Sequence, residues 1–81
     1  MAKHFTEEKM RALGSVAVLV RNTAWKCGRV ERLIVRHLHS KRTATSKVVD
    51  MIRHFQLEGK ARVEFIYTLK RLEGRYVIRL E

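Results

Sequence analysis

The chain has no proline, a single cysteine and few acidic residues, eight Asp and Glu among 81. The absence of proline excludes rigid prolyl linkers, so we expect one compact domain of helices and a hairpin over residues 1–81. The lone Cys27 excludes an intramolecular disulfide and is typical of a reducing interior. The sequence therefore indicates a cytoplasmic protein, or a nuclear one if the source is eukaryotic.

Long hydrophobic runs are also lacking. The longest apolar run covers residues 16–20, far short of the roughly 20 residues that cross a bilayer. Residues 1–5 have no apolar segment of the kind found in signal peptides. We expect neither a signal peptide nor a membrane partner.

Positive charge is abundant. Eighteen Lys and Arg give a formal net charge of +10, which favours a polyanionic partner, either nucleic acid or an anionic membrane surface. A merely solubilising surface is the alternative. The basic residues are spread along the chain, which indicates a charged folded surface rather than a basic tail.

Two helices are predicted in the first half. Thr6 is a suitable cap and Phe5 and Met10 a hydrophobic staple for a helix over residues 5–25, although the β-branched content of residues 14–20 also suits a short buried strand. A second helix is expected over residues 29–39, because its apolar residues recur on one face. The opposite face carries Arg29, Arg32 and Arg36. Arg32 and Arg36 are four residues apart, and an anionic partner would relieve their repulsion.

A third helix is expected over residues 46–57. Thr45 or Ser46 would cap it, and a left-handed Gly59 would end it. Its spacing predicts one buried side and one outer side. The buried side would hold Val48, Ile52 and Phe55, and the outer side Lys47, Asp50, Met51, Arg53 and His54.

Beyond Gly59 the apolar residues alternate with polar ones, which is typical of strands. Residues 61–67 and 75–80 would form a β-hairpin over 61–80. Its loop, residues 68–74, would either bulge around Lys70 and Arg71 or turn tightly at Gly74.

This order of three helices and a C-terminal β-hairpin, with the segment Thr45–Val63, resembles the winged-helix class of helix-turn-helix domains over about residues 29–81. The resemblance implies an α+β, winged-helix-like fold. It also implies that the 46–57 helix enters a major groove and that the 68–74 wing touches the DNA backbone or minor groove. The implied function is sequence-specific or semi-specific binding of double-stranded DNA, as a small nucleoid-associated transcriptional regulator or accessory factor.

The nucleic-acid-binding residues expected on this basis fall into three groups. Phosphate contacts are assigned to the basic residues Lys41, Arg42, Lys47, Lys70 and Arg71. Hydroxyl or amide contacts near a helix N-terminus are assigned to Thr43 and Thr45. Base contacts would involve Lys47, Arg53 and His54.

Other functions are weighed against this one. RNA binding and a winged-helix-type protein–protein interaction module are the alternatives, and the apolar stripe of the first helix suits a homodimer. We expect no enzyme, because no catalytic spacing or phosphate-binding glycine loop is present. Cys27, His37 and His39 match no zinc pattern, so no metal and no cofactor are expected. Trp25 is interpreted as a core or rim aromatic.

Overall fold

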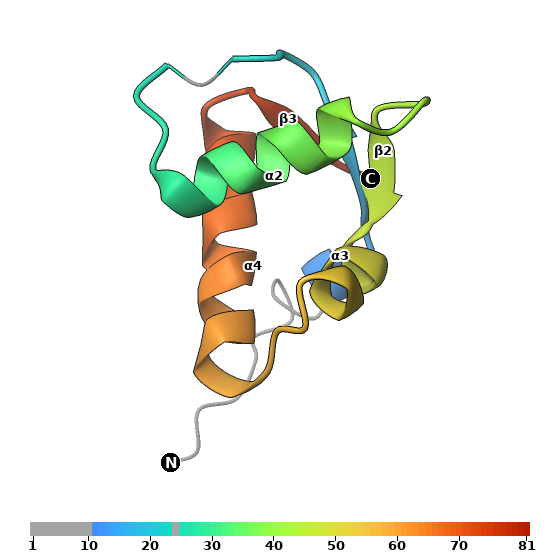
Figure 1. Ribbon diagram of the computed structural model, residues 1–81, viewed down its shortest axis with the longest axis vertical. Coiled ribbons are helices and arrows are strands. Elements are labelled where there is room, and N and C mark those ends of the chain that lie inside the picture. Colours follow the sequence, from blue (N-terminus) through green and yellow to red (C-terminus); the bar gives the residue numbers. More distant parts are fainter. Residues whose placement is uncertain (1–10, 24) are drawn as a thin grey trace.

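The computed structural model describes residues 11–23 and 25–81 and shows an α+β fold (Figure 1). Residues 11–13 are helical. The elements that follow are β1 (Val16–Leu19), α2 (Arg29–His39), β2 (Thr45–Lys47), α3 (Val48–His54), α4 (Gly59–Gly74) and β3 (Ile78–Leu80). The coarse α+β prediction is confirmed, whereas the winged-helix arrangement of three helices followed by a hairpin is not.

The three strands form an antiparallel sheet in the order β2-β1-β3. The central strand β1 pairs Ala17 with Ser46 on one side and with Leu80 on the other. The prediction of a helix through residues 16–19 is therefore wrong, and the strand alternative holds. The β-branched Val16 and Val18 favour extended backbone, and pairing along both edges satisfies the peptide groups of β1. The predicted cap and staple at Phe5, Thr6 and Met10 lie outside the described residues.

The helix α2 has the predicted bounds, but its apolar face is buried only in part, because Val30 and Leu33 are exposed. Ile34, Val35 and Leu38 enter a core shared with α3, α4 and the sheet. α2 lies across the C-terminal half of α4 and packs against it (Figure 1). This packing fixes the opposite, arginine-bearing face of α2 outward.

The third predicted helix is shorter than expected and is rotated. Residues 45–47 form β2, so neither Thr45 nor Ser46 caps α3, which begins at Val48 and ends at His54. Met51 is fully buried, whereas Ile52 is only partly buried. Pairing of residues 45–47 with β1 overrides the local capping signal. The Val48 N–H extends this pairing by donating to the Ser15 carbonyl oxygen at 3.0 Å.

The predicted β-hairpin over residues 61–80 is wrong, because residues 59–74 form α4. Phe65, Ile66, Leu69 and Leu72 are buried on one face at helical spacing. Gly59 does have a positive φ of 56°, but it begins α4; Gln56, also with φ 56°, is the left-handed residue after α3. Only residues 78–80 form a strand, and β3 pairs with β1.

Within the described part of the chain, no helix combines the length and apolar character needed to cross a membrane.

Candidate nucleic-acid interface

The outer face of α2 and the turn after it carry a run of positive charge. Residues 32–49 contain no Asp or Glu. Arg32 and Arg36 on α2 and Lys41 and Arg42 in the turn are all exposed. None of these four, which we call the basic strip, forms an ion pair with a described residue. Lys47, on β2, is likewise exposed and forms no ion pair with a described residue.

The turn that carries Lys41 and Arg42 is held by backbone hydrogen bonds. The Ala44 N–H donates to the Lys41 carbonyl oxygen at 3.0 Å, and the Leu19 N–H of β1 donates to the Ala44 carbonyl oxygen at 2.9 Å. Ala44 has a positive φ of 58°, which turns the chain into β2. The two basic side chains therefore project from a backbone that is fixed to the sheet.

A hollow of 420 Å³ opens beside the basic strip, between α2, β2 and α3. We call it the histidine hollow; its lining residues are His37, Lys41, Thr45, Ser46, Asp50, Arg53 and His54. It brings together four of the predicted binding residues, Lys41, Thr45, Arg53 and His54. Lys41 belongs both to the basic strip and to the lining of the hollow, so the two features meet at Lys41.

Two imidazoles form the wall between α2 and α3. The ring centroids of His37 and His54 are 4.6 Å apart, and the Phe55 ring lies 5.2 Å from the first and 5.0 Å from the second. Desolvation by burial, Lys41 and His54 together lower the pKa of His37 below 6.5. The His37 imidazole, whose pKa is lowered, can take up a proton when an anion arrives beside it.

Hydroxyl groups complete the predicted set. The Thr43 and Thr45 hydroxyls share a hydrogen bond of 2.7 Å. Thr43 is exposed in the turn, and Thr45 reaches the hollow from β2. Neither lies at a helix N-terminus, so the expected contact of a helix-capping hydroxyl with phosphate does not apply to them.

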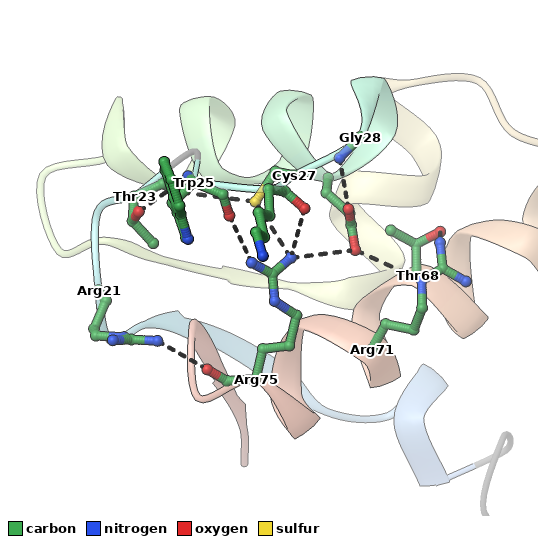
Figure 2. Close-up of polar contacts among 10 residues, drawn as sticks. Arg21, Thr23, Trp25, Cys27, Gly28, Thr68, Arg71 and Arg75 are labelled. Carbon is green, nitrogen blue, oxygen red and sulfur yellow. Dashed lines mark hydrogen bonds and ion pairs between the residues drawn. The ribbon is translucent and has the colours of Figure 1, made fainter.

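Lys70 and Arg71 are not brought to this surface. Both lie on α4 rather than on a wing, and both form ion pairs. Lys70 Nζ is 3.1 Å from Glu73 Oε1. Arg71 Nε is 3.5 Å from Glu31 Oε2 (Figure 2). Arg71 also donates to the Thr68 hydroxyl at 3.2 Å. The expectation that a wing supplies these two cations is wrong, because the wing is a helix.

Arg75 at the end of α4 fastens the loop before α2 (Figure 2). Its guanidinium donates to the carbonyl oxygens of Trp25 at 2.6 Å and Lys26 at 3.2 Å. Arg21 donates to the Arg75 carbonyl oxygen at 3.0 Å. Trp25 itself is 72% exposed rather than a core aromatic. These contacts hold the loop that leads into α2 against the end of α4.

The predicted site omitted Arg32 and Arg36. Their spacing of four residues on the face away from the core was visible in the sequence, as was the absence of carboxylates over residues 32–49. DNA binding was predicted for the third helix instead. In the structure α3 exposes Val49, Asp50 and Arg53, and Asp50 Oδ1 lies 4.0 Å from a guanidinium nitrogen of Arg53.

A second surface feature is apolar. Val30 and Leu33 of α2 and Tyr67 of α4 are 45%, 41% and 45% exposed. They line neighbouring hollows that share Val30, Leu57 and Phe65, the larger having 570 Å³. The charged residues of the larger hollow balance, two basic (Arg29, Arg71) and two acidic (Glu31, Glu64). We call this neutral surface the apolar groove.

Residues 11–23 and 25–81 contain no cluster of three or more His, Cys, Asp and Glu placed to hold a metal ion. Comparison with protein-family models, with curated proteins and with solved structures gives no match to this chain.

Proposed function

We propose that the protein binds double-stranded DNA through the basic strip, as a small accessory DNA-binding factor or transcriptional regulator. The observation that carries this proposal is a run of four exposed basic residues, Arg32, Arg36, Lys41 and Arg42, none of which forms an ion pair with a described carboxylate. Unpaired exposed cations on a chain of net charge +10 bind phosphates by releasing condensed counterions.

The contacts proposed are mainly to the DNA backbone. Guanidinium groups suit bidentate contacts to phosphate, and α2 presents Arg32 and Arg36 one helical turn apart. The groups available for base edges are Lys47, Arg53 and His54, with Arg53 beside Asp50. Binding of this kind is semi-specific. The relationship to winged-helix domains stays a proposal from the sequence, and this binding mode does not require it.

Duplex DNA is favoured over single strands because the strip lacks an aromatic platform. Single-stranded nucleic acids are held largely by stacking of bases on aromatic rings. The exposed aromatic residues, Trp25, Tyr67 and Tyr76, lie in the preceding loop, on α4 and after α4, outside the basic strip.

Fluorescence anisotropy with a duplex DNA, one of its strands and a duplex RNA of equal length, over a salt series, tests the proposal. Four phosphate contacts predict that the logarithm of the association constant falls with log salt with a slope of about −4. Tightest binding to duplex DNA with such a slope is the expected result. Absent duplex binding at low salt, or tighter binding to the single strand or to RNA, would overturn it.

We propose self-association through the apolar groove as a second function, because the acidic and basic residues that line the groove are equal in number. Two copies of a chain with charge +10 repel each other, so a second copy can approach most easily at a neutral face. The exposed Val30, Leu33 and Tyr67 would be covered there. Sedimentation of wild type, Val30→Lys and the control Val49→Lys tests it, since Val30 and Val49 are 45% and 43% exposed. A dimer lost only with Val30→Lys is expected, and a wild-type monomer at high concentration would contradict it.

A further inference from the structure

The histidine hollow brings together several side chains that can bind an anion. Its donors come from different elements: His37 from α2 with Lys41 just beyond it, and Arg53 and His54 from α3. Thr45 and Ser46 of β2 complete the lining, the Thr45 hydroxyl sharing a hydrogen bond with Thr43 and the Ser46 hydroxyl donating to the Lys47 carbonyl oxygen. Lys41 makes no ion pair with a described residue. Donors that converge from different elements on one open volume form a seat for a tetrahedral anion.

The formal charge of this seat depends on its two imidazoles. Lys41 and Arg53 contribute two positive charges and Asp50, 4.0 Å from Arg53, one negative charge. With both histidines neutral the hollow carries +1, and with both protonated it carries +3. The remaining lining groups, the hydroxyls of Thr45 and Ser46, are uncharged, and the adjacent Phe55 ring contributes no charge.

An anion and protons are therefore expected to bind together. Two imidazolium rings with centroids 4.6 Å apart repel each other, and Lys41 adds to this repulsion. A phosphate that accepts an N–H from each ring at the edge of the pair would offset this penalty. By linkage, an anion that favours the protonated rings binds more tightly as the pH falls.

We propose that the histidine hollow seats a phosphate group and that its affinity for this group rises as His37 and His54 take up protons. That the group is a backbone phosphate of DNA rests on the proposed function. Lys41 belongs both to the basic strip and to the lining of the hollow, so a duplex held by the strip would reach the seat at Lys41.

The test compares duplex binding at pH 7.5 and 5.5 at constant ionic strength in wild type, His54→Gln and His39→Gln. Each proton taken up on binding changes affinity by up to about tenfold per pH unit. We expect wild type to bind at least about tenfold more tightly at pH 5.5 and His54→Gln to lose most of this gain. His39 lines a different hollow, with Arg32 and Arg36, and is the matched control. Equal loss in both variants, or no loss in His54→Gln, overturns the proposal.

Titration with inorganic phosphate, followed by the imidazole NMR signals, separates this proposal from the proposed function. Shifts of His37 and His54 that exceed those of His39 support the seat, even if no duplex binds. Duplex binding that is independent of pH, with no selective phosphate shift, leaves DNA binding standing and overturns the seat.

Discussion

Arg71 on α4 directs its guanidinium toward Glu31 in the first turn of α2, with Nε 3.5 Å from Oε2. The Glu31 side chain is largely buried, accepts a hydrogen bond of 2.6 Å from the Gly28 N–H, and lies 3.9 Å from Arg75. Arg71, which was predicted to contact DNA, therefore links α4 to α2 through its ion pair with Glu31. The same carboxylate satisfies a backbone donor at the start of α2.

Replacing Glu31 with Gln should lower the free energy of unfolding by about 1–3 kcal/mol, because the charge-assisted contacts with Arg71 and Arg75 are lost. Chemical denaturation measures this change. Glu64→Gln is the control, since its exposed carboxylate forms no ion pair with a described residue. Equal stability of the two variants would contradict the structural role of Glu31.

The rotation of α3 yields a paired prediction. Met51→Ala should cost about 2–5 kcal/mol, because Met51 is fully buried and its truncation leaves a cavity. Ile52→Ala should cost clearly less, because Ile52 is only partly buried at the edge of the core. Thermal unfolding of both variants checks the order, and a larger loss for Ile52→Ala would restore the orientation predicted from sequence.

Tyr76 follows α4 with a positive φ of 61° while its side chain is 77% exposed. Glycine adopts this left-handed conformation without steric cost, so Tyr76→Gly should stabilise the protein by about 0.5–1 kcal/mol. Tyr76→Ala keeps the strain and should give no such gain. The melting temperatures of the two variants test this prediction. A melting temperature of Tyr76→Gly below that of Tyr76→Ala would contradict backbone strain at this position.

His37 predicts a pH dependence of stability. Its pKa in the folded protein is lowered from 6.5, so the unfolded chain binds the proton more readily than the folded one. This contribution to stability is present above pH 6.5 and is lost as the pH falls through the folded-state pKa. Melting temperatures from pH 8 to 5 in a buffer without phosphate should fall less for His37→Gln than for wild type. Parallel curves would contradict the shift.

Local sequence determined α2 well and the C-terminal half poorly. In α2 the apolar residues, among them Ile34 and Leu38, follow helical spacing and do not also fit the alternation typical of a strand. In residues 61–67 the alternation of Ala61, Val63 and Phe65 also fits a strand, and the helical set becomes clear only when Ile66 and Leu69 are included. The polar strand Thr45–Lys47 carries no apolar alternation, so its pairing with β1 depends on contacts distant in sequence.

The positions of the candidate site residues were likewise predicted correctly in one part of the chain and wrongly in another. Lys41, Arg53 and His54 were placed near one another because they flank a single short segment of chain. Lys70 and Arg71 were misplaced with the hairpin, and their acidic partners Glu73 and Glu31 became evident only from the packing of α4. Arg32 and Arg36 were noticed as a repelling pair, but their significance depends on the neighbouring Lys41 and Arg42.

The most direct measurement is the salt dependence of duplex binding in Arg32→Gln/Arg36→Gln, compared with Lys60→Gln/Arg62→Gln, which removes the same charge from the exposed first turn of α4. The first variant should bind more weakly, with the slope reduced in magnitude by about 2, and the second should keep nearly the wild-type slope. Equal slopes in the two variants would contradict the assignment of the basic strip as the DNA-binding surface.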